Sequence, residues 1–480
     1  MERADSLAAR DRETLIHSFT NLAEHAEHGP LVIERGEGVY VLDEAGHRYL
    51  EGMAGLWCTA LGFSEARLVQ AAQEQMARLP AYHLFGGKAY APAIGLAERL
   101  LALAPAPMAR ALFVNSGSEA NDTALKLVRY YHHAIGKPEK RKIISRVRAY
   151  HGATLAAASA TGIPHAHQDF GLPLQGFLHA DCPHYYRYGL PGETEEQFAS
   201  RLAENLERLI LREGADTVGA FIAEPLMGAG GVIPPPASYF DKVQAVLKTY
   251  DVLLIADEVI TGFGRTGAMF GCETYGIRPD LITLAKALSS GYQPIGAVLI
   301  SEAIHDVMLA QSRKIGTFGH GFTYGGHPVC TAVALRTLEI YEQDDILGQV
   351  RARAPHFAAR IHALGGHPLV GDARAVGLVG AVELMANGKF RIPFKPDLRV
   401  GARVVQRALE QGVILRPLND TVSFCPPLII NATEIDFLFD VVGRALDQVA
   451  AELPRGSSGC SRLKPRVRAG GRRPLEEGLS

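Results

Sequence analysis

The 480-residue sequence contains no apolar run of about 18 residues, the length from which a membrane-spanning helix is inferred. Its amino terminus, MERADSLAARDRETLIHSF, is charged and lacks the apolar core of a secretory signal. The formal net charge of −2 indicates no basic surface for nucleic acid or for an anionic membrane. We therefore expect a cytoplasmic protein without a membrane span and without a nucleic-acid partner.

Metal-binding and disulfide patterns are also missing. The six cysteines are scattered without a CxxC pair, and the 18 histidines contain no HExxH pattern. These absences argue against a zinc site and against a disulfide framework, so no metal ion is predicted. Reduced, mostly buried thiols in a cytoplasmic protein are the better interpretation.

The order of polar and apolar segments indicates an α/β fold. The chain is long enough for more than one substructure, and 47% of its residues are apolar. Residues 1–60 begin with a polar, helix-like segment and continue with a hairpin-like stretch around the turn Asp43-Glu44-Ala45-Gly46. From about Leu61 to Gly326, amphipathic helices alternate with candidate strands, which are ALFV, KIIS, GAFIAEP, VLLIADEV, LITLAKAL and GAVLI. Several of these strands are apolar at consecutive positions, which predicts a largely parallel sheet covered on both faces.

The chain changes in character after residue 326. A helix at about Val329–Glu342 leads into a smaller α+β segment with the candidate strand VGLVGAVEL and a helix near Ile435–Glu452. Residues 454–480 show no periodicity and carry seven basic and two acidic residues, which predicts a disordered tail. A nucleic-acid-binding arm is the alternative interpretation of this tail.

A turn rich in serine and glycine follows the candidate strand ALFV. Ser116, Gly117 and Ser118 open a helix whose apolar residues recur with a 3.6-residue period. Hydroxyl groups and free backbone N–H groups at the positive end of a helix dipole bind phosphate. The same serines would also suit an ordinary helix cap, so the turn by itself leaves both interpretations open.

Two charged residues stand in apolar surroundings further along the chain. Asp257 ends the candidate strand VLLIADEV, at the edge where open α/β sheets bind ligands, and a buried carboxylate needs a cationic partner. A protonated pyridine nitrogen would be such a partner, whereas the rival interpretation, a metal ion, lacks a second ligand at suitable spacing. Lys286 lies within the strand-like run LITLAKAL, where desolvation lowers the pKa of its amine and makes it a nucleophile toward an aldehyde. A lysine that extends to solvent from a strand end is the alternative.

These motifs, in this order, resemble those of the class III (ω-amino acid:pyruvate type) aminotransferases, enzymes of fold type I that use pyridoxal 5′-phosphate (PLP). The resemblance covers roughly residues 10–453 and includes the segments NSGSEANDTALKLVRYYH, AFIAEPLMGAGGVIPPPASYF, VLLIADEVITGFGRTG, PDLITLAKALSSGYQPIGAV and HGFTYGGHPVC. It implies a large PLP-binding domain at residues 61–326, with a mostly parallel sheet of the seven-stranded type. Residues 1–60 and 327–453 would together form a smaller α+β domain.

The resemblance also implies roles for individual residues. Lys286 is expected to carry PLP as a Schiff base and to shuttle a proton, while Asp257 pairs with the pyridine nitrogen. Tyr150 and Val259 would pack on the two faces of the ring, and Glu224 would lie near its substituents. The expected phosphate ligands are Ser116, Gly117, Ser118 and, from the neighbouring subunit, Thr323. The expected substrate-binding residues are Phe19, Trp57, Phe85, Tyr150 and a mobile, carboxylate-binding arginine, Arg416.

A site shared between two chains implies a homodimer or homotetramer. For Trp57, the single tryptophan, the residues alone favour an ordinary core aromatic. Gly86 and Gly87 stand where close relatives carry side chains, and His165 stands near a position that is bulkier in relatives. We hypothesise that the two glycines open the pocket to bulky or long amines; the competing interpretation is a loop that needs positive φ.

The implied reaction is transamination by a ping-pong mechanism. An amine or ω-amino acid gives its amino group to PLP, and a keto acid, expected to be pyruvate, takes it up and leaves as alanine. The alternatives within fold type I are a 2-oxoglutarate-linked aminotransferase, an aminomutase and a decarboxylase. A nucleotide-binding dehydrogenase is disfavoured because no GxGxxG follows a strand. A binding protein built on an inactive aminotransferase fold is disfavoured because Lys286 and Asp257 are both present.

Overall fold

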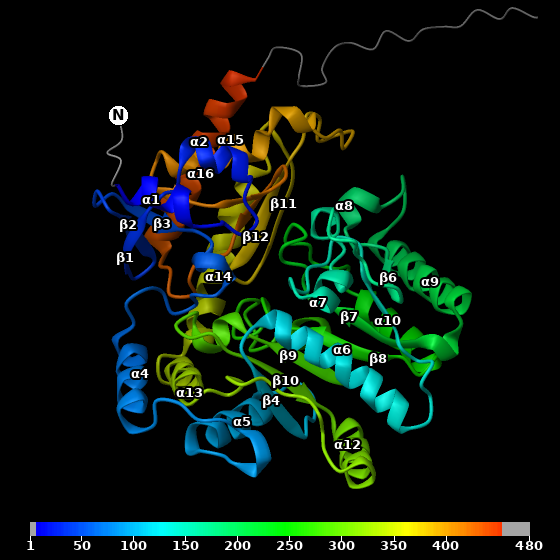
Figure 1. Cartoon of the computed structure of the whole chain (residues 1–480). Coiled ribbons are helices and arrows are strands. Elements are labelled where there is room, and N and C mark those ends of the chain that lie inside the picture. Colours follow the sequence, from blue (N-terminus) through cyan, green and yellow to red (C-terminus); the bar gives the residue numbers. More distant parts are fainter. Residues whose placement is uncertain (1–5, 454–480) are drawn as a thin grey trace, which may run out of the picture.

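The structure, a computed structural model, describes residues 6–453, so the tail predicted at 454–480 lies outside the described residues. Within the described range the strands form one sheet of seven strands and two sheets of four. Figure 1 shows the large sheet among the cyan and green helices, and the smaller sheets beside the blue, orange and yellow elements. No helix between residues 6 and 453 is long and apolar enough to cross a membrane.

The large sheet has the order β4-β10-β9-β8-β7-β5-β6. Its strands are β4 (Arg110–Val114), β5 (Lys142–Arg146), β6 (Phe177–Ala180), β7 (Val218–Ala223), β8 (Leu253–Asp257), β9 (Leu281–Leu284) and β10 (Gly296–Ile300). All neighbouring strands from β9 to β6 are parallel, whereas β10 runs antiparallel to both β9 and β4. The segment between β9 and β10 holds only a short 3₁₀ turn, and a parallel return would need a longer crossover. The prediction of a mostly parallel seven-stranded sheet is confirmed.

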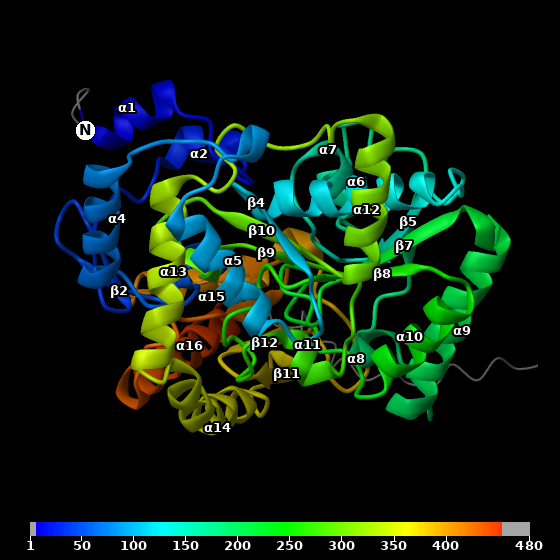
Figure 2. The ribbon, with the colours of Figure 1, turned by 90° about the horizontal axis from the view of Figure 1, so that it is seen from below.

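Helices cover both faces of this sheet. In β7, Ala220 and Ile222 belong to one apolar cluster with α6, whereas Phe221 and Ala223 belong to another with α9 and α10. Because alternate strand residues point to opposite faces, the two clusters form two layers of core. Figure 2 shows α5 and α13 packed together near the β4 edge. The helices around this sheet are α5 (Ala91–Leu103), α6 (Gly117–Ala134), α7 (Leu155–Ala160), α8 (Tyr185–Tyr188), α9 (Glu195–Glu213), α10 (Tyr239–Thr249), α11 (Gly271–Tyr275), α12 (Glu302–Ile315) and α13 (Pro328–Gln343).

The two smaller sheets have the orders β1-β2-β3-β13 and β11-β12-β15-β14. Their strands are β1 (Ile33–Glu37), β2 (Tyr40–Asp43), β3 (Arg48–Glu51), β11 (Val370–Val376), β12 (Val379–Leu384), β13 (Val413–Ile414), β14 (Arg416–Leu418) and β15 (Thr421–Phe424). The predicted hairpin is present, with Tyr40 of β2 opposite Leu50 of β3. β13 pairs in parallel with β3, so the amino-terminal and carboxy-terminal parts of the chain share a sheet. The domain boundaries at residues 60, 326 and 453 stay predictions.

The remaining helices lie at the two ends of the described chain. They are α1 (Leu7–Thr14), α2 (Leu22–His28), α3 (Ala54–Trp57), α4 (Ala66–Arg78), α14 (Ile346–Leu364), α15 (Val400–Leu409) and α16 (Ala432–Glu452). The helices predicted near residues 329–342 and 435–452 are present as α13 and α16. α16 starts earlier than predicted because Asn431 caps it: the Asn431 side chain accepts a hydrogen bond from the backbone N–H of Glu434.

The expectation of a strand at Lys286 is wrong. β9 ends at Leu284, and Lys286 begins a short 3₁₀ helix, η4 (Lys286–Ser289), with a φ of 49°. The run LITLAKAL is largely apolar because most of the strand and of the following turn is buried, and apolar periodicity does not separate the two. The left-handed backbone at Lys286 turns the chain at the end of the strand.

Candidate active site

A cavity of about 420 Å³ lies at the carboxyl ends of β7 and β8, beside the amino-terminal end of α6. Open α/β sheets bind ligands at this edge, and the volume is in the range of small-molecule sites. All the cofactor-binding residues expected from the same chain line this cavity: Ser116, Gly117, Ser118, Tyr150, Glu224, Asp257, Val259 and Lys286. Folding therefore brings together residues that are far apart in the sequence.

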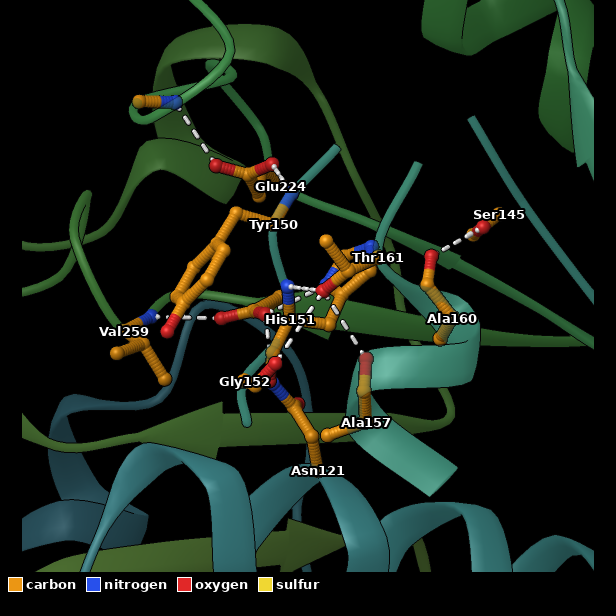
Figure 3. Close-up of polar contacts among 12 residues, drawn as sticks. Asn121, Ser145, Tyr150, His151, Gly152, Ala157, Ala160, Thr161, Glu224 and Val259 are labelled. Carbon is orange, nitrogen blue, oxygen red and sulfur yellow. Dashed lines mark hydrogen bonds and ion pairs between the residues drawn. The ribbon is translucent and has the colours of Figure 1, made fainter. Parts of the chain in front are cut away.

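Asp257 is the last residue of β8 and is only 3% exposed. Its Oδ2 accepts hydrogen bonds from Asn121 Nδ2 and lies 2.7 Å from His151 Nδ1, while its Oδ1 accepts from the backbone N–H of Val259 at 3.1 Å. Figure 3 shows His151 and Asn121 in this network. Three hydrogen-bonding groups thus fix the orientation of the carboxylate at the edge of the cavity.

Glu224 connects β7 to the segment that carries Tyr150. Its carboxylate accepts hydrogen bonds from the backbone N–H groups of Tyr150, at 3.0 Å, and of Gly228, at 2.8 Å (Figure 3). Burial raises the pKa of Glu224 above its ordinary value. The side chain therefore positions the Tyr150 backbone as well as lining the cavity.

Lys286 brings an amine into the same cavity. Burial lowers the pKa of its side chain below the ordinary value, although the nearby Asp257 carboxylate opposes this change. A lower pKa increases the fraction of neutral amine, which is the nucleophilic form. The side chain is only partly exposed and lines the cavity, so it faces the cavity rather than the outer surface of the protein.

The amino terminus of α6 is capped by a serine side chain and lines the cavity. Ser116 caps the helix, since its Oγ accepts a hydrogen bond from the backbone N–H of Glu119 at 3.1 Å. Ser118 Oγ accepts from the backbone N–H of Ala153 at 3.0 Å. A Cβ atom on Gly117 would lie 2.9 Å from Val259 Cγ1, so only glycine allows this close approach. The capping interpretation holds, and the same helix end faces the cavity, as phosphate binding requires.

This set of groups fits PLP. The cofactor carries an anionic phosphate, an aldehyde and a pyridine nitrogen, which require a donor-rich helix end, an amine and a carboxylate respectively. The cavity offers all three, and Tyr150 and Val259 also line it. Asn121 Oδ1 is buried in the same wall without a hydrogen-bond partner among residues 6–453, which leaves an acceptor available to a bound group.

The other expected site residues do not line this cavity. Phe19 is close to it, because its ring centroid lies 6.1 Å from that of Tyr150. Trp57 is buried in an apolar cluster that also contains the cavity-lining Ile260. The charge of Arg416 acts on the Tyr150 hydroxyl, and burial lowers the pKa of its guanidinium.

Phe85 and Thr323 form a separate, exposed location. Phe85 is 50% exposed, and its ring lies against the loop that carries Thr323, since a Cβ on Gly321 would be 3.2 Å from Phe85 Cζ. Gly86 and Gly87, next to Phe85, have φ values of 60° and 77°. The interpretation of these glycines as residues that permit positive φ is therefore correct for the backbone, and an effect on substrate size stays a hypothesis.

Sequence reasoning missed two members of the site, His151 and Asn121. A signal was present for each. His151 follows Tyr150 in the YHG motif, and Asn121 lies one helical turn after Gly117, on the same face of α6. A histidine or an asparagine at these positions does not by itself indicate a site residue, because the sequence does not show which strand end each one will contact.

Comparison with known proteins agrees with this geometry. The sequence profile of the family described as aminotransferase class-III matches residues 22–446. The chain belongs to the class III aminotransferases. It is a PLP-dependent transaminase of fold type I, as its motifs indicated.

Several relatives of this aminotransferase cover most of its length. Gamma aminobutyrate transaminase 3, chloroplastic, from Solanum lycopersicum is 54% identical over 418 residues, which are 87% of this chain and 80% of the relative. The omega transaminase from Pseudomonas jessenii in complex with PMP has a TM-score of 0.92 at 50% identity, covering 93% of this chain and 99% of that one. The PMP-bound aminotransferase from Vibrio fluvialis has the same TM-score at 42% identity, covering 94% and 100%.

Proposed function

We propose that this transaminase moves an amino group from an amine or ω-amino acid to a keto acid, with pyruvate as the acceptor and alanine as the product. The observation that carries the proposal is the meeting of Lys286, Asp257 and the α6 terminus at one cavity. The names of two relatives support the donor class. The tomato protein is named for gamma-aminobutyrate, an ω-amino acid, and the P. jessenii protein is called an omega transaminase.

In this proposal each side chain has a physical task. Ser116, Gly117 and Ser118 bind the phosphate at the α6 terminus, and Asp257 accepts a hydrogen bond from the protonated pyridine nitrogen. Bound PLP supplies the electron-withdrawing ring that stabilises negative charge at the substrate Cα. Lys286 would hold the cofactor at its aldehyde group, and its neutral amine would serve as the base that holds the proton removed from the substrate Cα.

Arg416 is the proposed binding group for a carboxylate. A guanidinium binds a carboxylate through two parallel hydrogen bonds, and partial burial strengthens that pairing. The keto acid needs this contact in its half-reaction, whereas an amine without a carboxylate does not. Phe19, Trp57 and Tyr150 would then surround the apolar part of the substrate.

We further propose that the enzyme is a homodimer or larger, with active sites shared between chains. Phe85 packs near Gly321, two residues before Thr323, and both Phe85 and Thr323 are exposed and lie outside the cavity of their own chain. In a dimer this exposed location would meet the cavity of the partner, where Thr323 would complete the phosphate site. The exposed Phe85 ring would then be buried against the substrate.

Steady-state kinetics test the reaction. With an amine and pyruvate varied together, parallel double-reciprocal lines are expected, with one alanine formed for each amine consumed. Lys286→Ala should abolish transfer. Lys140→Ala, which also removes a buried lysine but far from the chemistry, should keep it. Intersecting double-reciprocal lines would contradict the ping-pong mechanism. Loss of the amine without formation of alanine would indicate an aminomutase or a decarboxylase. A requirement for 2-oxoglutarate would reject pyruvate as the acceptor.

Mixed dimers test the shared site. Lys286→Ala and Thr323→Asp chains, each inactive alone, are dissociated and reassociated together. If sites are shared, each hybrid has one site with neither change, and activity returns to about one quarter of wild type, because half of random dimers are hybrids. No recovery, although sedimentation shows hybrid dimers, would mean that each site belongs to a single chain.

The expectation of a cytoplasmic location stays a prediction. Two of the tomato relatives are named as chloroplastic and mitochondrial enzymes. Fluorescence microscopy of the full chain with a carboxy-terminal tag in its own cell would test it.

A further inference from the structure

The amino-terminal segment gathers two histidines around one aspartate. Asp11 lies on α1, His25 lies on α2, and His17 lies in the linker between the helices. His17 Nε2 is 2.9 Å from Asp11 Oδ2, and His25 Nε2 is 2.9 Å from Asp11 Oδ1. The two imidazole centroids are 4.1 Å apart. Each imidazole thus directs its Nε2 atom toward the Asp11 carboxylate.

We propose that Asp11, His17 and His25 bind a divalent transition-metal ion of the zinc class. Two imidazole nitrogens and one carboxylate oxygen are a ligand set that Zn²⁺, Co²⁺ and Ni²⁺ accept, with water in a fourth position. A tetrahedral ion with bonds of about 2.0–2.1 Å separates its ligand atoms by about 3.3 Å. The present nitrogen-to-oxygen separations of 2.9–3.1 Å need to widen by only a few tenths of an ångström, and all the ligand atoms already lie within 4.8 Å of one another.

The surroundings favour this cluster over the other metal-like group among residues 6–453. That group consists of His184, Asp372 and Glu383. Two arginine side chains already pair with Glu383: Arg374, whose Nη1 is 2.9 Å from the carboxylate, and Arg187. The two arginines would repel a metal ion. The Asp11 side chain, in contrast, pairs with imidazoles, which become metal ligands in their neutral form. Its cluster is also partly open, since the His17 side chain is 33% exposed and offers a route of entry.

An ion bound by this cluster would affect Phe19, a residue close to the cavity. Phe19 lies between His17 and His25 in the sequence, and its ring is 6.1 Å from Tyr150 and 6.0 Å from His165. An ion would join α1, the linker and α2, and so restrict the motion of Phe19 over the cavity. This effect on substrate rests on the proposed function, whereas metal binding does not.

Cobalt binding to the full-length holoenzyme tests the site, in protein without a polyhistidine tag and after treatment with a chelator. We expect the visible d–d absorption of tetrahedral Co²⁺, saturating at one ion per chain and lost on adding Zn²⁺. His17→Gln, His25→Gln and Asp11→Asn should each weaken binding at least about 100-fold. His28→Gln, which removes an exposed histidine of the same helix, should bind as wild type does. Melting temperatures measured with chelator present show whether each variant folds.

Two measurements on the wild-type chain avoid variants altogether. Zn²⁺ should protect His17 and His25, but not His28, from modification by diethyl pyrocarbonate, as read by peptide mapping. It should also slow chymotryptic cleavage after the exposed Phe19. The proposal would be overturned if Co²⁺ binding did not saturate, if all variants bound Co²⁺ equally, or if Zn²⁺ did not protect His17 and His25. The cluster would then be only a set of hydrogen bonds that joins α1, the linker and α2. Transaminase activity takes no part in these readouts, so they fail or succeed independently of the proposed function.

Discussion

His151 Nδ1 lies 2.7 Å from Asp257 Oδ2, and neither side chain is more than 3% exposed. The imidazole thus stands behind the carboxylate on which the proposed cofactor pairing depends. A hydrogen bond to a buried charged group contributes about 1.5–3 kcal/mol. His151 is therefore a positioning residue for Asp257, acting through the carboxylate rather than on the substrate.

His151→Ala should lower the affinity for PLP by about 10–100-fold, which is the equivalent of that hydrogen bond. The reason is that Asp257 loses a hydrogen-bond partner that holds its carboxylate in position. Fluorescence titration of the apoenzyme with PLP measures the change. His132→Ala is the matched control, because His132 is equally buried and has one hydrogen bond, to Gly219 O, outside the cavity. Equal losses in both variants would mean that His151 is merely structural.

Arg416→Ala should raise the KM for pyruvate by about 10–100-fold, because the variant loses a charge-assisted pair of hydrogen bonds to the carboxylate. The KM for a donor amine that lacks a carboxylate should stay within about twofold, since that amine makes no such contact. Initial-rate kinetics with each substrate varied give both values. Arg444→Ala, an exposed arginine on α16, is the control. A parallel rise in both KM values would remove Arg416 from carboxylate recognition.

Glu51 predicts a pH dependence of stability. It ends β3, is 4% exposed, and accepts hydrogen bonds from the backbone N–H groups of Met53 and Gly55 in the segment that carries Trp57. Burial raises the pKa of Glu51 from its ordinary 4.5 to about 7. Because the folded protein holds this proton more tightly than the unfolded chain, its stabilising effect is complete below pH 4.5 and is lost as the pH rises through about 7.

Between pH 5 and pH 8, Glu51→Gln should gain stability relative to wild type by up to about 3 kcal/mol. A glutamine does not titrate, so the free energy of unfolding of the variant does not fall over this pH range as that of the wild type does. Thermal unfolding of the apoenzyme across this range measures it, with the exposed Glu27→Gln as control. A constant difference between wild type and Glu51→Gln at every pH would show that Glu51 does not titrate there.

Two substitutions at Gly86 separate pocket size from backbone strain. Gly86 has a φ of 60°, so any side chain costs about 1–2 kcal/mol. Gly86→Ala carries this strain with little volume, whereas Gly86→Phe adds a ring. If the glycine opens a shared pocket, Gly86→Phe should lower kcat/KM for bulky amines at least tenfold more than for short ones, and Gly86→Ala should not. An unchanged ratio in both variants would leave the backbone conformation as the reason for glycine.

Local patterns predicted the framework well because they depend on residues that are close in sequence. The candidate strand GAVLI is β10 from its first to its last residue, and the DEAG turn joins β2 to β3. Asp257 could be placed at a strand end because buried strands are apolar at every position and a charge marks their limit. The same reasoning misplaced Lys286, since a buried turn is as apolar as a buried strand.

Relations across the chain were beyond any local pattern. His151 and Asn121 meet Asp257 because β4, β5 and β8 run in the same direction and end at one edge, an arrangement set by strand order. Asp11, His17 and His25 follow no metal-binding spacing, and only the folding of the amino-terminal segment brings them together.

The sequence by itself determined the α/β class, the buried acid and amine, and the family, because hydrophobic pattern and motif order are properties of a one-dimensional chain. Tertiary structure alone decided that His151 supports Asp257 and that Phe85 and Thr323 lie outside the cavity of their own chain. It also decided that Lys286 has a left-handed backbone conformation and lines the cavity. These depend on which strand ends and loops become neighbours. That choice is made by burying apolar surface over the whole molecule, and no short segment records it.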